Sequence, residues 1–322
     1  MEREVVAFDE RHIESAAALL EGAHSYPRAD ALDVAEVGTA ARLVREWQGV
    51  GPAVAALCDG ALVGFMAATL TDAPGNQVAR IRIDQHAAGP ENRRDTYRRL
   101  YAALSGELVA VGAFEHAISV ATDQDDVVRH LFELGFGIDQ VKGLRRLTPI
   151  AASGVTTRPA GAEDIHDLLL LTAELTTFHA QPPMLRPALV ELHEIGNGFQ
   201  EALVEERRLL LVAEHDGRIA GLMQAGPDRN YRDAATIGLA AVTSAARSKG
   251  VGTALLAGVV EWAAAQGFHR CGVEWTSPNL LSDPFWRGHD FDPVRYKLTR
   301  LIDARVAWAN ADLSYRYFVP RA

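Results

Sequence analysis

Two glycines and two basic residues form the cluster in this chain best suited to chemistry. Gly250 and Gly252 stand between a predicted strand over residues 236–242 and a long predicted helix, with Arg247 and Lys249 just before them. Glycine lets a backbone close tightly around a ligand, and the first turn of a helix presents unpaired N–H groups at the positive end of its dipole. The arrangement predicts an anion site suited to a pyrophosphate. The alternative is an ordinary strand-to-helix turn with glycines for close packing.

The wider context of this cluster matches a known pattern. Val242, Arg247, Gly250 and Gly252 form V-x-x-x-x-R-x-x-G-x-G, which resembles the acetyl-CoA loop of the GNAT superfamily of N-acetyltransferases. Residues 157–164 look like the opening strand and helix start of that family, the Asp-Gly turn at 216–217 like its central hairpin, and Asn279 with residues 285–291 like its closing motif. The resemblance covers essentially the whole second half of the chain.

The resemblance implies a position for the cofactor. Acetyl-CoA, or another acyl-CoA, would lie in a cleft where two strands separate, and no metal is implied. Its pantetheine amides would pair with the free edge of Ala240, Ala241 and Val242. Its pyrophosphate would lie on the loop made of Arg247, Ser248, Lys249, Gly250, Val251, Gly252 and Thr253. Asn279 would bond the cofactor arm, or serve only as a helix N-cap.

The expected chemistry is direct attack of an amine on the thioester, which needs a base and a proton donor for the thiolate. The family's usual donor is a tyrosine, but this chain has Trp286 at that position, whose indole N–H is no useful acid. Ser282, four residues earlier on the same helix face, is the substitute we predict, unless it only bonds the backbone at the helix start. Glu274 and His289 are the candidate bases. The simpler interpretations are that Glu274 is a solvated strand residue and that His289 is a turn residue.

Matching landmarks recur roughly 155 residues apart, which is a domain-sized period. The clearest are two Asp-Gly turns, Asp59-Gly60 and Asp216-Gly217, each between alternating apolar runs that predict a β-hairpin. Around each hairpin the order of predicted strands and helices repeats, with opening helices over 10–20 and 162–177. We therefore predict an α/β fold of two tandem GNAT-like domains, residues 1–150 and 151–322, each a mixed, largely antiparallel sheet flanked by helices.

The first domain lacks the glycine loop. Over residues 84–96 bulky side chains occupy the glycine positions, and Pro90 removes a backbone donor. We interpret this copy as degenerate and structural, although His86 at a strand end is a residue that could still face a cleft.

Composition narrows the class of protein. The 322 residues carry a net charge of −10, which argues against nucleic-acid and anionic-membrane partners and would attract a cationic substrate. Cys58 and Cys271 lie far apart in predicted strands, as reduced and buried cysteines do. With no apolar run near ~18 residues and no signal-like start, we expect a cytoplasmic protein. The tail after Asp303 has aromatic residues (Trp308, Tyr315, Tyr317 and Phe318), so it packs on its own chain or on a second subunit of a homodimer.

Two functions from different classes fit these observations. The first is an enzyme that acetylates a primary amine of a small molecule, with substrate contacts over residues 178–186 and the 190s. The second is a non-catalytic acyl-CoA-binding or regulatory protein. A Rossmann dinucleotide site is excluded because Gly250 and Gly252 are not followed by a third glycine at the required spacing.

Overall fold

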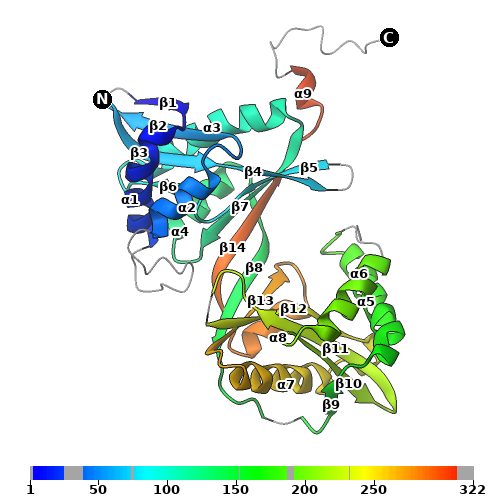
Figure 1. Ribbon diagram of the computed structural model, residues 1–322. Coiled ribbons are helices and arrows are strands. Elements are labelled where there is room, and N and C mark those ends of the chain that lie inside the picture. The colour runs from blue at the N-terminus through cyan, green and yellow to red at the C-terminus, as the bar shows by residue number, and fades with distance from the viewer. Residues whose placement is uncertain are drawn as a thin grey trace, which may run out of the picture. The chain divides into compact units, whose positions relative to one another are not determined.

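The computed structural model describes residues 3–24, 39–73, 76–151, 153–186, 192–231 and 233–309 (Figure 1). The chain divides into two compact units, each of which is described by itself. Unit 1 holds residues 1–140 and 294–322, and unit 2 holds residues 141–293.

Unit 1 contains two groups of strands. Most of its helices occupy the predicted places in the order of strands and helices along the chain. Strands β1, β2, β3 and β6 form one sheet, while β4, β5, β7 and β14 are neighbours in another. The elements are β1 (Arg3–Ala7), α1 (Ile13–His24), α2 (Thr39–Trp47), β2 (Ala53–Cys58), β3 (Ala61–Ala67), β4 (Thr69–Ala73), β5 (Asn76–Ile81), β6 (His86–Ala88), α3 (Arg93–Ala110), β7 (Ala113–Ala121), α4 (Asp125–Glu133) and β8 (Gly137–Arg146). Strand β5 pairs antiparallel with β4 and in parallel with β7, as β12 pairs with β11 and β13 in unit 2.

Unit 2 is a sheet with the neighbour order β8, β13, β12, β11, β10, β9. Its elements are β9 (Thr156–Pro159), α5 (Ile165–Ala180), α6 (Leu192–Val204), β10 (Leu209–His215), β11 (Arg218–Pro227), β12 (Ala234–Val242), α7 (Val251–Ala265), β13 (Arg270–Thr276) and α8 (Ser282–Gly288), and the chain continues into β14 (Asp292–Leu301) and α9 (Val306–Ala309). All strand pairs with a described register in this unit are antiparallel except β12 with β13.

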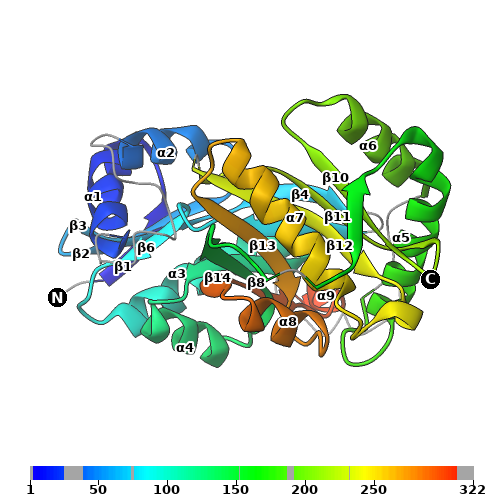
Figure 2. The ribbon, with the colours of Figure 1, turned by 90° about the horizontal axis from the view of Figure 1, so that it is seen from below.

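Helices cover both faces of the unit 2 sheet, because the strands alternate apolar side chains between the two faces. Leu210 and Val212 of β10 pack with Leu168 and Phe199 of α5 and α6. Leu211, between them, faces α7, where its side chain approaches Gly258. Figure 2 shows α7 lying across β10, β11 and β12.

The internal repeat is confirmed by matching details in the two units. Each Asp-Gly hairpin holds its turn residues at positive φ, and each has a register shift opposite Ala56/Leu57 or Ala213/Glu214, which leaves Val63 or Ala220 of the second strand as the extra residue. Gly64 and Gly221 occupy the same place after the turns: a Cβ on Gly64 would lie 2.6 Å from Thr96 of α3, and one on Gly221 would lie 2.9 Å from Val251 of α7. In both units these glycines let a long helix pack closely on the sheet.

The compact units differ from the domains predicted at 1–150 and 151–322. Residues 141–146 of β8 fall in unit 2, where Lys142 bonds to Asp228. Residues 294–301 of β14 fall in unit 1, where they pair antiparallel with β7. Periodicity predicts that a segment is a strand, but it does not specify the strand's partner, so the boundary in the sequence and the boundary between units do not coincide.

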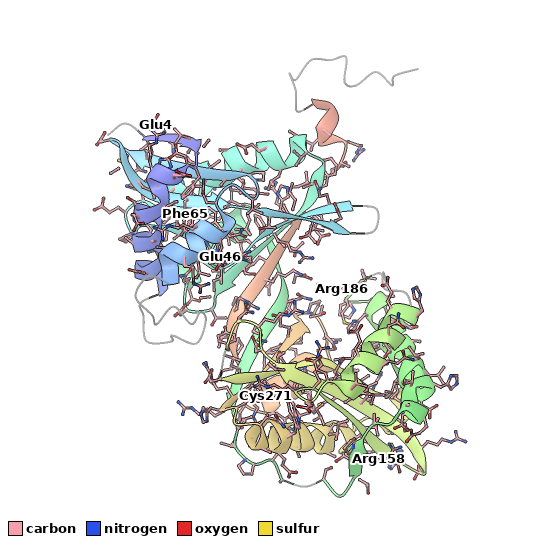
Figure 3. All side chains as sticks on the ribbon, viewed as in Figure 1. Glu4, Glu46, Phe65, Arg158, Arg186 and Cys271 are labelled. Atoms are coloured by element: carbon pink, nitrogen blue, oxygen red, sulfur yellow. The ribbon has the colours of Figure 1, made fainter. Side chains whose placement is uncertain are left out.

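Both cysteines are free thiols, and Cys271 is fully buried within the sheet of unit 2 (Figure 3). Burial raises the pKa of the Cys271 thiol to about 12, which makes it a packing residue and not a nucleophile. None of the described helices is long and apolar enough to cross a membrane. The predicted aromatic tail (Tyr315, Tyr317 and Phe318) and the side chain of Trp308 lie outside what the structure describes.

Candidate functional site

Strands β12 and β13 run side by side for only part of their length. Their parallel register begins at Ala234↔Arg270 and ends at Ile237↔Val273, although both strands continue beyond these residues. On its other edge, β12 stays paired with β11 as far as Val242. A register shift at Gln224/Ala225 leaves Gly238 as the extra residue of β12, so a bulge lies where the pairing with β13 ends.

The bulge gives β12 one free edge next to a gap in the sheet. Ala240, Ala241 and Val242 pair with Met223, Leu222 and Gly221 of β11 on one side only, among the register pairs described. A strand edge with unpaired N–H and C=O groups can accept an extended ligand as an added strand. This is the geometry that the sequence predicted for the pantetheine arm.

The loop after β12 ends in a helix start built for close approach. Gly250 is the N-cap residue of α7 with φ of +83°, and Ser248 also has positive φ, at 61°. A Cβ at Gly252 would lie 3.1 Å from the ring of Phe285, so a side chain there would need space from that ring. The N–H groups of the first turn of this 15-residue helix have no partner within the helix. The backbone N–H groups of Lys249, just before the helix, and of Val251 and Thr253 in its first turn are three of the donors in this loop.

Arg247 is held by helix α5. Its Nη2 lies 3.8 Å from Glu174 Oε1, and its guanidinium lies 5.0 Å from the centre of the Phe178 ring. Burial raises the pKa of the Glu174 carboxyl, but the Ser244 N–H, the Thr243 and Ser244 hydroxyls and Arg247 outweigh it, so the net pKa is below the usual value. Arg247 therefore has a carboxylate partner here, and the loop's backbone amides are the main donors toward an anion.

Asn279 caps helix α8. Its Oδ1 accepts from the N–H groups of Leu281 and Ser282, both at 3.0 Å, and the residue is buried. The simpler of the two interpretations of this residue is thus present in the structure. A contact between the cofactor and the side-chain amide nitrogen of Asn279 stays a prediction.

The candidate acid lies at the start of the same helix. Ser282 Oγ is shielded from solvent and makes no hydrogen bond in the part of the chain that the structure describes. Trp286 is buried and packs edge-on against Phe285 and Phe291. The indole that replaces the family's tyrosine is therefore part of a small aromatic core.

His289 lies beside the glycine loop. Its Nδ1 is 2.8 Å from the carbonyl oxygen of Phe285 and its Nε2 is 3.3 Å from Thr253 Oγ1. Because the carbonyl can only accept, Nδ1 carries the hydrogen and Nε2 is available to accept from Thr253. The structure does not bring His289 together with Glu274.

A pocket of about 600 Å³ opens where β12 and β13 separate. It is lined by Lys142, Glu205, Arg208, residues 224–230, residues 236–238 and Glu274. Glu274 is exposed on β13, one residue beyond the last pair with β12. Of the three predicted catalytic residues, Glu274 is the one that lines this pocket. Of the predicted substrate segments, 178–186 and the 190s, no residue that the structure describes lines it.

The pocket also contains an ion pair that sequence reasoning missed. Lys142 and Asp228 are both at least nine-tenths buried, with Nζ 2.6 Å from Oδ2, and Lys142 Nζ also bonds Thr236 Oγ1 at 3.0 Å. Lys142 occupies the space left by Gly272, where a Cβ would lie 2.9 Å from Nζ. A lone lysine in a predicted strand next to the supposed domain junction was a signal, because lysine is rarely buried without a partner.

The corresponding gap in unit 1 is bridged. There β5 and β7 are the parallel pair, and their register ends at Ile81↔Ile118. His86 Nε2 then contacts the carbonyl oxygen of Ser119 on β7 at 2.9 Å, and its Nδ1 contacts the Tyr97 hydroxyl of α3 at 2.8 Å. His86 is 3% exposed, so it faces no open cleft. The N-cap of α3 still adopts the left-handed conformation, but with Asn92 in place of a glycine.

Comparison with known proteins agrees with this geometry. Residues 172–291 match the model of the acetyltransferase (GNAT) family, a span that begins within α5 and includes β12, the glycine loop, α7 and β13. Most of unit 2 therefore matches the GNAT family. No curated protein sequence matches the chain.

Solved structures extend the likeness to both halves of the chain. A GCN5-related N-acetyltransferase from Sphaerobacter thermophilus, 16% identical, covers 93% of this chain and 95% of its own, with a TM-score of 0.59. A tandem GNAT protein from the clavulanic acid biosynthesis pathway, 17% identical, covers 93% and 98% with a TM-score of 0.55. A fungal multi-domain β-N-acetylglucosaminidase with a GCN5-related glucosamine N-acetyltransferase region, 12% identical, covers 92% of this chain with a TM-score of 0.58, and this chain spans 38% of that protein. These likenesses show the predicted tandem GNAT fold.

Proposed function

We propose that this protein transfers an acetyl group from acetyl-CoA to a primary amine of a small molecule, using the site in unit 2. The observation that carries the proposal is the end of β12–β13 pairing at Ile237, with the bulge at Gly238 beside it and the glycine loop of α7 at the other end of the same strand. One strand thus connects an anion site to a pocket, as a long cofactor with a reactive end requires.

The contacts proposed for the cofactor come mainly from the backbone. The edge of residues 240–242 would pair with the pantetheine arm, and the amides of residues 248–253 would hold the pyrophosphate. Arg247 would have to exchange its contact with Glu174 for one with phosphate. None of these contacts involves the acyl group, so another acyl-CoA would bind the same loop.

The proposed reaction is direct attack of the amine on the thioester. The amine nitrogen bonds to the thioester carbonyl carbon, the carbon–sulfur bond breaks, one proton leaves the nitrogen and one joins the thiolate. Glu274, which lines the pocket, is our proposed base. Ser282 is our proposed proton donor, and its unpartnered hydroxyl supports that role. The place of His289 beside Thr253 suits a contact with the cofactor phosphates better than a base for the amine.

A second candidate is an acyl-CoA-binding protein without turnover. It is favoured by the buried indole at Trp286 and by the shielding of Ser282 Oγ from solvent, because a proton donor must reach the sulfur. Both candidates share the cofactor site and differ only in turnover. For either, we propose a cytoplasmic location, which fits two free cysteines.

Turnover separates the two candidates. We would incubate the protein with acetyl-CoA and a panel of primary amines and measure the release of the free thiol of CoA. The enzyme proposal predicts thiol release that depends on the amine and disappears in Gly252→Glu, whose side chain would displace the Phe285 ring and bring a negative charge to the loop proposed for the pyrophosphate.

Ala264→Glu is the matched control, because it adds the same charge at an exposed position near the other end of α7. It should retain wild-type turnover. Binding of acetyl-CoA without thiol release for any amine would favour the binding protein, and the absence of binding would contradict both.

A further inference from the structure

One side chain of helix α5 holds the turn that connects β12 to the glycine loop. The turn is a single 3-10 turn over Ser244–Ala246, and Thr243 precedes it. Glu174 Oε1 accepts from the Ser244 N–H at 2.7 Å, and Glu174 Oε2 accepts from the Thr243 hydroxyl at 2.9 Å. Because both carboxylate oxygens accept a hydrogen bond from this turn, Glu174 fixes the place where the loop begins.

The same carboxylate also contacts a cation of the loop. Arg247 Nη2 lies 3.8 Å from Glu174 Oε1, and the guanidinium lies 5.0 Å from the ring centre of Phe178, four residues further along α5. The side chains of Arg247 and Glu174 are 33% and 36% exposed. An ion pair this open to solvent is weak, so a bound anion can replace Glu174 as the partner of Arg247.

Glu174 brings a negative charge to the start of a loop that is proposed to hold a pyrophosphate. Burial raises the pKa of this carboxyl, but the hydrogen bonds from the turn and the nearby Arg247 lower it more, so Glu174 is charged at neutral pH. A pyrophosphate on the backbone amides of residues 248–253 would add further negative charge to the same loop. Two anions would then compete for one guanidinium.

We propose that Glu174 determines the affinity of the loop for the cofactor, as the internal anion that the pyrophosphate displaces from Arg247. The carboxylate keeps its hydrogen bonds to Thr243 and Ser244, and only the guanidinium changes its partner. The charge of Glu174 therefore opposes cofactor binding, while its hydrogen bonds support binding by fixing the turn. This inference rests on the proposed function for the identity of the cofactor, but it concerns affinity and is tested without turnover.

The test is calorimetric titration with CoA of the wild type and of Glu174→Gln. The glutamine amide can accept from the Ser244 N–H and donate to the Thr243 hydroxyl, so the variant keeps both hydrogen bonds and loses the charge. The proposal predicts about three- to tenfold tighter binding of CoA at low salt. The gain should shrink as the ionic strength rises, because salt screens charges near the surface.

Three further variants locate the effect. Glu261→Gln removes the same charge from an exposed position on α7 and should leave CoA affinity unchanged. Glu174→Ala, which also loses the hydrogen bonds to the turn, should bind CoA more weakly than Glu174→Gln. In an Arg247→Gln background the gain from Glu174→Gln should be smaller, because no guanidinium is left to release.

The proposal is overturned if Glu174→Gln binds CoA no more tightly than the wild type, if the gain is equal in the Arg247→Gln background, or if Glu261→Gln gives the same gain. Failure of the proposed function would show separately, because an absence of thiol release with every amine would contradict acetyl transfer while these differences in CoA affinity persist.

Discussion

At the scale of single residues, the two loop glycines matter because neither has a side chain. Gly250 has positive φ, and a Cβ at Gly252 would lie 3.1 Å from the ring of Phe285. Their contact with a cofactor stays a prediction. The pair Lys142–Asp228 was missed because its members lie 86 residues apart, and only the folded sheet brings them together. Glu274 was predicted as a base from its type and its strand, and that role stays a prediction; its place beside a pocket is visible only in the folded structure.

Ser282 offers a clear test of the catalytic assignment. Among the described residues its Oγ has no partner, and it has no solvent contact, so Ser282→Ala loses no hydrogen bond seen in the structure and should leave the free energy of unfolding unchanged or slightly higher. If the hydroxyl protonates the leaving thiolate, kcat should fall about 10²-fold or more while acetyl-CoA affinity stays the same. Unchanged kcat would show that the residue is only structural.

At the scale of elements, the repeat makes the packing of α7 on β11 predictable. A Cβ at Gly221 would lie 2.9 Å from Val251 Cγ1 and 3.0 Å from both the Ala241 carbonyl oxygen and Leu255 Cδ1. Gly221→Ala should therefore cost about 1–3 kcal/mol of unfolding free energy, measured in denaturant, and weaken acetyl-CoA binding by moving the helix start. Gly106→Ala in α3, where the new Cβ meets open space, should instead gain about 0.5–1 kcal/mol.

A buried histidine links α3 and β7 in unit 1 and should make the stability of this unit depend on pH. His116 is fully buried, with Nδ1 2.9 Å from the Tyr101 hydroxyl and Nε2 3.0 Å from the Ala113 carbonyl oxygen. Burial lowers its pKa from the usual 6.5; the Ala113 carbonyl acts against this and Arg300 acts with it. The unfolded chain then binds the proton more readily than the folded chain, so this contribution is present above pH 6.5 and is lost as the pH falls below it.

The measurement is the melting temperature of the wild type and of His116→Gln between pH 7.5 and about 5. The wild type should lose more stability than the variant over the acidic part of this range. Equal pH dependence of the two proteins would show that His116 is not the group responsible.

At the scale of the whole molecule, the sequence predicted the fold class. It did not predict that the last strand of each predicted domain belongs mostly to the other compact unit. Element order and the Asp-Gly hairpins predicted two tandem domains, but unit 2 includes residues 141–150 and unit 1 includes residues 294–322. A fragment cut at the predicted boundary, 151–322, would lack Lys142 and leave Asp228 buried without its cation, at a cost of about 3–5 kcal/mol. We expect fragment 141–293 to melt at a higher temperature than fragment 151–322. The reverse order would contradict the assignment of β8 to unit 2.

The central claim is that one of the two GNAT-like copies binds the cofactor, and calorimetric stoichiometry with acetyl-CoA tests it most directly. The account predicts one site per chain, lost in Gly252→Glu and retained in Asn92→Asp, which adds a negative charge at the corresponding helix start of unit 1 with a residue that tolerates positive φ. Two sites per chain, or loss of binding in Asn92→Asp with binding kept in Gly252→Glu, would contradict it.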